Sequence, residues 1–351
     1  MTWTPLLLSD PSPCLRWLVL HHLFQYPEDH PEVIELAGLR ESDPLVNQIL
    51  SFQEVDGSWK PFLLSEGGAG SNRILSTSFA LARLGFLGFD QHHLAVRSGA
   101  AYLFAQQRED GSWPLPVEVK LTEEGEEISS REGYSLMPLQ TAFPLRGLAA
   151  CGYATDPRAE KAFDWLLAQR LMDGAWPTGI ASGVYGYVAG YRRIAHSRWG
   201  CRSNTTGVLI CLALHPQRRH SAEARRALDL LLGRETHEES TLGYEVARLV
   251  GAERVHGFIT FFARYDLALM LCLCSQVGVS MEDERLNSLV GFIRSQQGEY
   301  GLWDYANRPQ IRRWLTFDIL KSLLGLDETG DWLSLEPRTP FQSYPRRRKR
   351  F

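Results

Sequence analysis

Gln53-Glu54-Val55-Asp56-Gly57-Ser58-Trp59 is the first copy of a short phrase that recurs along this chain of 351 residues. Three further copies, each beginning at Gln and ending at Trp, span 107–113, 169–176 and 297–303. We call each copy a tag. Successive glutamines lie 54, 62 and 128 residues apart, so the last interval holds one repeat whose tag is lost, near 230–235. A period of this kind is typical of a fold built from stacked structural repeats.

Two kinds of helix alternate between the tags. Each tag follows an amphipathic helical pattern, and its glycine ends the helix because glycine tolerates the left-handed conformation. These outer helices are predicted over 43–53, 92–107, 157–169, 222–235 and 282–297. The other helices are apolar around their whole circumference, which indicates burial on all sides. These inner helices are predicted over 14–24, 77–86, 141–151, 205–214, 265–276 and 316–324.

Inner helices that alternate with outer ones predict an all-α fold, an α/α toroid in which the two sets form a closed double ring. A helix over 30–37, ended by Gly38, would complete the outer ring. The alternative is an open array of helical hairpins. We expect a single domain over 1–327 and a C-terminal tail with a basic end over 328–351. The long connections before the inner helices all fall at one end of the ring, where we expect a site.

Composition restricts the functional class. With 44% hydrophobic and 22% charged residues, the chain is expected to form a core. A net charge of −4 gives no reason to expect a nucleic acid partner. The six cysteines show no paired spacing, the N-terminus lacks the features of a signal peptide, and no apolar run is long enough for a membrane span. We therefore expect a cytoplasmic protein with reduced thiols.

The tags, the alternating helices and the period together resemble the prenyltransferase and squalene-cyclase superfamily. In that superfamily, glutamine–tryptophan repeats tie outer helices to the loops beside them. The resemblance covers residues 43–326 and implies a structural role for the tag pairs Gln53/Trp59, Gln107/Trp113, Gln169/Trp176 and Gln297/Trp303. An amide can satisfy free groups at a helix end while an indole covers them. We expect the first three tryptophan rings to be buried.

The catalytic signatures of that superfamily are incomplete in this chain. Its cyclases that protonate an alkene use an Asp-x-Asp-Asp motif, and its ionisation-type synthases use Asp-Asp-x-x-Asp, but no two aspartates are adjacent in this sequence. Protein prenyltransferase β subunits bind zinc through Asp, Cys and His, and Leu315 stands where that histidine would fall. We therefore expect no metal and no cofactor. The alternative is a zinc site formed by His196, Cys201, His256 and Asp266.

Asp266 and Asp318 are the best-supported candidates for catalytic residues. Each stands near the start of a predicted inner helix, and they are 52 residues, or one repeat, apart. Inner helices one repeat apart are neighbours in a closed ring. Two carboxyl groups in an apolar cavity can share a proton, which raises the pKa of one of them enough for it to act as an acid. We predict an acid pair; the alternative is helix capping, or pairing with Arg264, Arg312 or Arg313.

Polar and aromatic residues near the starts of inner helices are candidates for substrate binding. The segment before the fourth inner helix supplies four of them, and three other inner helices supply one each. The set is His196, Cys201, Arg202, Asn204, Gln140, Tyr265 and Trp314. An alternative use of Cys201 is nucleophilic catalysis, with His196 as its activating base at a helix N-terminus.

These features favour a prenyltransferase- or terpene cyclase-like toroid that binds an isoprenoid or another apolar ligand in a central cavity, with acid-promoted chemistry. The first alternative is a non-catalytic binding or scaffold protein on the same fold. A second is a carbohydrate-active enzyme, since these also use helical toroids and two carboxylates. Five consecutive basic residues over 346–350 favour a solvated tail, with weak peripheral contact with anionic lipid as the alternative.

Overall fold

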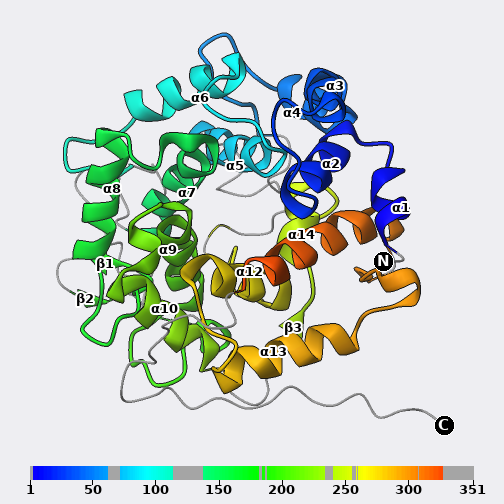
Figure 1. The fold of residues 1–351 in the computed structure, drawn as a ribbon. Coiled ribbons are helices and arrows are strands. Elements are labelled where there is room, and N and C mark those ends of the chain that lie inside the picture. The colour runs from blue at the N-terminus through cyan, green and yellow to red at the C-terminus, as the bar shows by residue number, and fades with distance from the viewer. Residues whose placement is uncertain are drawn as a thin grey trace. The chain divides into compact units, whose positions relative to one another are not determined.

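The structure of the chain, a computed structural model, describes residues 3–61, 72–113, 137–181, 184–185, 188–233, 240–254, 258, 260–306 and 308–326 (Figure 1). These residues are mostly helical, and the chain divides into two compact units. Unit 1 comprises Met1–Ser51, Glu235–Glu253 and Tyr265–Phe351. Unit 2 comprises Phe52–Arg234 and Arg254–Arg264. Each unit has its own layers of inner and outer helices.

The inner helices of unit 2 pack side by side. Helix α7 (Pro138–Leu148) contacts both α5 (Arg73–Phe86) and α9 (Arg202–Leu214). Every residue of α7 is buried, as expected of a helix that is apolar on all sides. A π-helical turn, η3 (Ala149–Tyr153), extends α7 at its C-terminal end.

The outer helices of unit 2 cover the inner ones. Helix α6 (Leu94–Ala105) packs on α5, α8 (Pro157–Ala168) on α7, and α10 (Ala222–Leu232) on α9. In Figure 1, α6 and α8 lie outside α5 and α7. The short elements of unit 2 are β1 (Ile180–Ala181), its antiparallel partner β2 (Val184–Tyr185), η4 (Gly190–Arg192) and η5 (Arg218–His220).

Unit 1 has the same layering. The inner helices α12 (Leu267–Val277) and α14 (Arg312–Leu324) pack against each other, and the outer helix α13 (Glu284–Ser295) packs on α12. Helix α2 (Pro13–Leu18) continues as the π-helical turn η1 (Val19–Leu23), which contacts α14, and α3 (Pro31–Leu39) packs on α2.

The remaining elements of unit 1 are short. Strand β3 runs parallel to β4. The elements are α1 (Thr4–Leu8), η2 (Arg40–Ser42), α4 (Pro44–Leu50), β3 (Ser240–Thr241), α11 (Tyr244–Leu249), β4 (Tyr265–Asp266), η6 (Glu299–Gly301) and η7 (Pro309–Ile311).

The tags join outer helices to inner ones, as predicted. All four tag tryptophans are buried, with at most 2% of any of them exposed. In three tags the indole Nε1–H donates to a backbone carbonyl in the last turn of the preceding outer helix. These bonds are Trp113 to Leu103 (2.8 Å), Trp176 to Leu166 (2.6 Å) and Trp303 to Ile293 (2.7 Å). The indole therefore satisfies a carbonyl that the helix end leaves free.

A threonine completes each junction, and the sequence reasoning did not assign it this role. The backbone N–H of the tag tryptophan donates to the hydroxyl oxygen of a threonine in the next inner helix. The acceptors are Thr77 (3.0 Å), Thr141 (3.3 Å), Thr205 (3.0 Å) and Thr316 (3.0 Å). The signal was present in the sequence, because each of these threonines stood at the start of a predicted inner helix.

In the first two tags the glutamine also reaches the next outer helix. The Nε2 of Gln53 donates to the carbonyl of Ala95 in α6 (2.9 Å), and that of Gln107 to the carbonyl of Arg158 in α8 (2.9 Å). The tag glycine has a positive φ, and a Cβ on Gly57 would overlap the backbone of Ser98. Glycine is therefore required both by backbone conformation and by the closeness of the next helix.

The all-α class is confirmed, and the alternation of inner and outer helices within each unit is consistent with an α/α toroid. Predicted helix limits hold within about four residues. The largest misses are at the starts of α5, which begins at Arg73 rather than at 77, and of α14, which begins at Arg312 rather than at 316. Ring closure and the single domain over 1–327 stay predictions. The tail over 328–351 lies outside the described residues.

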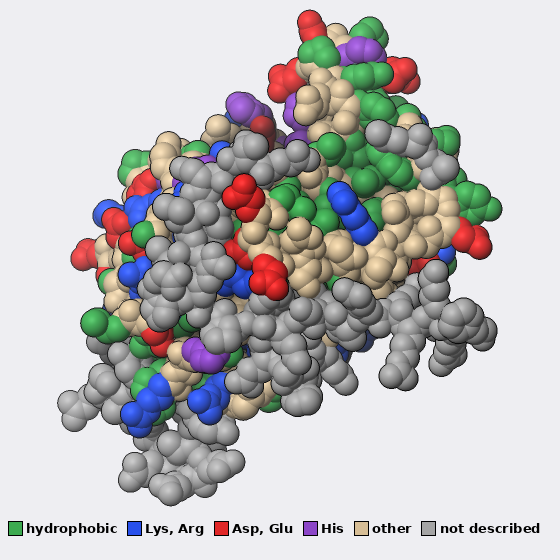
Figure 2. All heavy atoms as spheres, turned by 60° about the horizontal axis from the view of Figure 1, so that its bottom comes forward, with side chains coloured by type: hydrophobic (Ala, Val, Ile, Leu, Met, Phe, Trp, Pro, Cys, Tyr) green, Lys and Arg blue, Asp and Glu red, His purple; other side chains and the backbone are tan. Residues whose placement is uncertain are grey.

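The described surface carries mixed charge. On the face drawn in Figure 2, Lys and Arg side chains are interspersed with Asp and Glu, as expected for a net charge of −4. Among the described residues, no helix has the length and apolar character needed to cross a membrane. The six cysteines are free thiols.

Candidate active site

Asp266 ties two helix starts together in unit 1. Its buried carboxylate accepts hydrogen bonds from the backbone N–H groups of Ala268 (3.1 Å), Gly243 (2.8 Å) and Glu245 (2.6 Å). Burial raises the pKa of Asp266, and the N–H groups of Glu245 and Gly243 oppose that rise. Both carboxylate oxygens accept, so these contacts suit the ionised form. The helix-capping alternative therefore describes Asp266, which holds the starts of α11 and α12.

Asp318 has a different environment. It lies in the middle of α14, is partly exposed, and among the described residues no group hydrogen-bonds its carboxyl group. Loss of hydration raises the pKa of Asp318 to about 7; nearby Lys321 opposes this rise, and the charges of Asp266 and Glu245 add to it. With a pKa of about 7, Asp318 is about half protonated at neutral pH, and within the described part of the chain its carboxyl group lacks the backbone N–H contacts that suit the ionised form of Asp266.

Glu245 is a third carboxyl group beside this pair, and the sequence reasoning missed it. It is 4% exposed and forms an ion pair with Arg248, which is 2% exposed. The Arg248 guanidinium also lies 4.7 Å from the ring centre of Tyr244. These residues belong to α11, which packs on α14. A six-residue helix carries too little periodicity to be recognised from sequence.

The stability of the protein is expected to depend on pH through Asp318. Its pKa rises from the ordinary 3.8 to about 7 on folding, so the folded state binds this proton more tightly than the unfolded state. The resulting stabilisation is complete below about pH 4 and is lost as the pH rises to about 7, by up to ~1.4 kcal/mol per pH unit. Asp318→Asn should therefore gain stability relative to the wild type over that range. Urea unfolding from pH 4 to pH 8 measures the difference, and a constant difference would contradict the raised pKa.

Gln140 and Asn204 complete the N-terminal turn of α7 in unit 2. The Gln140 side chain accepts a hydrogen bond from the backbone N–H of Met137 (3.0 Å), and Asn204 Oδ1 accepts one from that of Leu139 (2.8 Å). Both residues are at most 2% exposed. The Asn204 Nδ2 is buried and, among the described residues, has no partner.

The other candidates in unit 2 lie just before α9 or in its first turn. Arg202 donates to the backbone carbonyls of Tyr191 (3.4 Å), Arg193 (3.3 Å) and Ala263 (3.2 Å), so its guanidinium holds chain segments together. Cys201 is fully buried, and its N–H donates to the carbonyl of Trp176 (2.8 Å). His196 is exposed and has a positive φ of 63°. Its ring is thus on the surface rather than in the interior.

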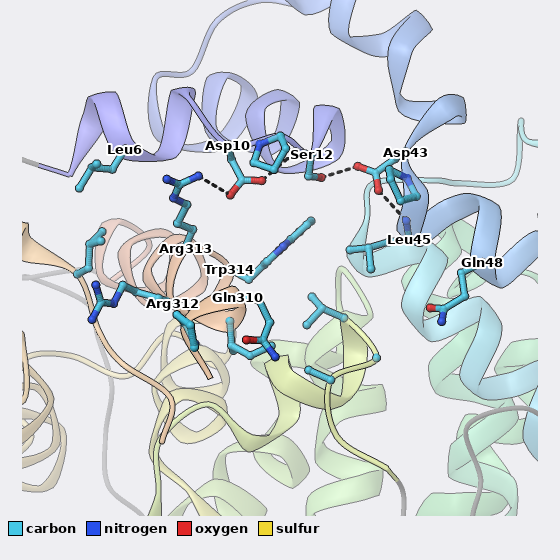
Figure 3. A pocket seen from close by; sticks show the side chains of 18 of the residues that line it. Leu6, Asp10, Ser12, Asp43, Leu45, Gln48, Gln310, Arg312, Arg313 and Trp314 are labelled. Atoms are coloured by element: carbon cyan, nitrogen blue, oxygen red, sulfur yellow. Dashed lines mark hydrogen bonds and ion pairs between the residues drawn. The ribbon is translucent and has the colours of Figure 1, made fainter. Parts of the chain in front are cut away.

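Tyr265 and Trp314 belong to unit 1, and both are buried. Trp314 lines a cleft of about 840 Å³ (Figure 3). On its wall Arg313 pairs with Asp10 (3.1 Å), and the Ser12 hydroxyl donates to Asp43. Neither member of the predicted acid pair lines this cleft. The predicted set therefore divides: the carboxyl groups, Tyr265 and Trp314 lie in unit 1, and the remaining candidates lie in unit 2.

The zinc alternative finds no geometric support in the described part of the chain. No group of three His, Cys, Asp or Glu side chains is placed there to hold a metal ion. His256 lies outside the described residues. The buried thiols Cys14, Cys151, Cys211 and Cys274 all have raised pKa values because burial disfavours the thiolate.

Comparison with known proteins matches the sequence resemblance. Residues 31–189 match the squalene-hopene cyclase C-terminal domain family. A squalene–hopene cyclase of Zymomonas mobilis is 32% identical over 167 residues, which is 46% of this chain and 23% of the relative. A lanosterol synthase of Candida albicans is 26% identical over 164 residues, 46% of this chain and 20% of the relative. The chain thus spans less than a quarter of either relative's length in these matches.

Solved structures with low overall likeness include the type II terpene cyclase MstE from Scytonema, at a TM-score of 0.34 and 15% identity, covering 80% of this chain and 95% of that chain. A structure of an MstE variant in complex with its substrate, geranylgeranyl dihydroxybenzoate, has a TM-score of 0.35 at 14% identity. The match covers 80% of this chain and 94% of the MstE chain. Likeness at this level carries no functional conclusion. The family match confirms the predicted resemblance to the prenyltransferase and squalene-cyclase superfamily.

Proposed function

We propose that this terpene cyclase-like chain binds an isoprenoid-like apolar ligand against its inner helices and protonates it with Asp318. The observation that carries the proposal is the group of three carboxyl residues of unit 1, the buried Asp266 and Glu245 and the partly exposed Asp318. One carboxylate is fixed by three backbone N–H groups, one is paired with Arg248, and Asp318 is left with a proton and, among the described residues, no hydrogen-bonding partner.

Protonation of an alkene requires carboxyl groups in different environments, one that donates a proton and one that stays ionised. Asp318 transfers its proton to one carbon of an alkene, the π electrons form the new C–H bond, and the other carbon becomes a cation. The Asp266 carboxylate, held in place by N–H donors, attracts the developing cation in a site of low dielectric. A pKa near 7 keeps the proton on Asp318 until the ligand binds. Attack by a second alkene and loss of a proton give a cyclic product and restore the acid.

The non-catalytic alternative is favoured by one observation. Asp266 has a complete structural role as a cap for two helices, so a carboxyl group at this position does not by itself require a reaction. In that case Asp318 would be a partly exposed acid that takes no part in a reaction.

The test is incubation of the purified protein with farnesol, geranylgeraniol and squalene at pH 6 and pH 8. Binding is measured by native mass spectrometry and products by gas chromatography with mass detection. We expect a cyclic isomer, or its hydrated form, from at least one ligand and more of it at pH 6, where Asp318 is protonated. Binding without product would overturn the acid role and support the non-catalytic alternative. Absence of binding across the panel would overturn both.

A further inference from the structure

In unit 2, three hydroxyl and amide side chains each have a buried polar atom without a hydrogen-bonding partner in the described part of the chain. These atoms are Thr178 Oγ1, Ser203 Oγ and Asn204 Nδ2. The three residues are at most 2% exposed. Leaving a buried polar atom unpaired costs roughly 1–3 kcal/mol, so native proteins keep such atoms where water or a ligand satisfies them.

Contacts bring these three residues to one place. Ser203 and Asn204 are consecutive in the first turn of α9, and Asn204 Oδ1 accepts the N–H of Leu139 in the first turn of α7. The N–H of Cys201 donates to the carbonyl of Trp176, two residues before Thr178 (2.8 Å). The next residue, Gly179, faces the side chain of Met137, and an added Cβ would lie 3.6 Å from it. All three unpaired atoms therefore belong to segments that flank the start of α7.

The three unpaired atoms are not needed to cap a helix, because other side-chain atoms already accept the backbone N–H groups around them. Gln140 satisfies the N–H of Met137, and Asn204 Oδ1 satisfies that of Leu139. The Thr205 hydroxyl, two residues along from Ser203, accepts the N–H of Trp176 (3.0 Å). Local structure thus uses the neighbouring polar groups and leaves Thr178 Oγ1, Ser203 Oγ and Asn204 Nδ2 available.

Their chemistry indicates the kind of atom they fit. The two lone pairs of one uncharged oxygen can accept hydrogen bonds from two of these groups, and a ligand hydroxyl can also donate to the third. All three atoms belong to uncharged side chains. The nearby Arg202 donates to three backbone carbonyls, and Arg192, whose guanidinium donates to Cys201 Sγ (3.9 Å), has a buried Nε without a partner among the described residues. A pure hydrocarbon would leave all three atoms unpaired, whereas a ligand carbonyl would pair with two of them and a ligand hydroxyl with all three.

We propose that Thr178, Ser203 and Asn204 form a polar subsite within unit 2 that binds a hydroxyl or carbonyl oxygen of an apolar ligand. This inference rests on the proposed function for the class of ligand alone, an isoprenoid, and it adds that the ligand bound in unit 2 carries an oxygen atom. A site built to hydrogen-bond an oxygen discriminates strongly against the analogue that lacks it, because its own polar groups are then unpaired.

The test compares two probes of similar hydrocarbon shape, farnesol and farnesene, with the wild type and a Thr178→Val/Ser203→Ala double variant. The wild type should bind farnesol more tightly than farnesene. Removing two hydrogen bonds at about 1 kcal/mol each should lower this preference by about tenfold or more. Without ligand, the melting temperature of the double variant should equal or exceed that of the wild type, since no hydrogen bond is lost.

Thr205→Val is the matched control. Its hydroxyl has a partner, so this variant should melt at a lower temperature and keep the preference for farnesol. If the double variant melts as low as Thr205→Val, the two hydroxyls hold only structural water, and the subsite is overturned. Equal binding of both probes by the wild type also overturns the subsite but leaves the proposed function standing. Binding of neither probe overturns the subsite, whereas the proposed function is then decided by the binding of geranylgeraniol and squalene.

Discussion

Asp318→Asn is expected to slow the proposed acid-promoted reaction by about 10²–10⁴-fold, the usual contribution of a positioned general acid. Asparagine has nearly the same shape and keeps α14 intact, but it carries no acidic proton. No hydrogen bond to the Asp318 carboxyl group is found among the described residues, so the substitution removes no contact of that kind. Single-turnover conversion of the best ligand from the product screen, at pH 6, measures the loss.

Glu284→Gln provides the control for that variant. Glu284 is exposed on the outer helix α13 and also loses one carboxyl group, so its rate should stay at the wild-type value. Ligand affinity should change little in Asp318→Asn, since the substitution acts on proton transfer rather than on binding. A rate within threefold of the wild type would remove Asp318 as the acid.

Repeat spacing carried the most reliable information about this site. Asp266 and Asp318 were paired because they stand one repeat apart, and the helices that follow or carry them, α12 and α14, do pack together. Spacing could not show which of the two carboxyl groups holds the proton. That difference comes from the N–H groups of Gly243 and Glu245, which a loop and a six-residue helix bring to Asp266 from 21 to 23 residues away.

The candidates at the starts of the inner helices also show what the sequence alone cannot predict. Polarity at the helix starts selected Asn204, Gln140 and Arg202, and all three are buried in the structure. Sequence alone could not separate polar groups that cap helices from those left unpaired, because the distinction depends on the backbone of the neighbouring helix. His196 was selected because imidazole can bind a ligand or a metal. In the structure His196 has a left-handed backbone conformation, and its side chain is exposed.

The tag tryptophans offer the largest expected change in stability. Trp176→Ala should lower the free energy of unfolding by about 3–5 kcal/mol, as for other buried large aromatic residues. The ring is fully buried, and its Nε1–H satisfies the carbonyl of Leu166 at the end of α8 (2.6 Å). Alanine would leave a cavity and also an unpaired carbonyl. The backbone N–H bond to Thr205 survives, so the junction is weakened rather than abolished.

Urea unfolding followed by circular dichroism measures this loss, with Trp199→Ala as the matched control. Trp199 lies in the loop that precedes α9 and is 37% exposed, so its replacement should cost no more than about 1 kcal/mol. If the tag tryptophans hold the helix junctions together, the losses of the two variants must differ by several-fold. Equal losses would mean that the indole of Trp176 contributes only bulk apolar area, and that the junction between α8 and α9 is held by the backbone and threonine contacts instead.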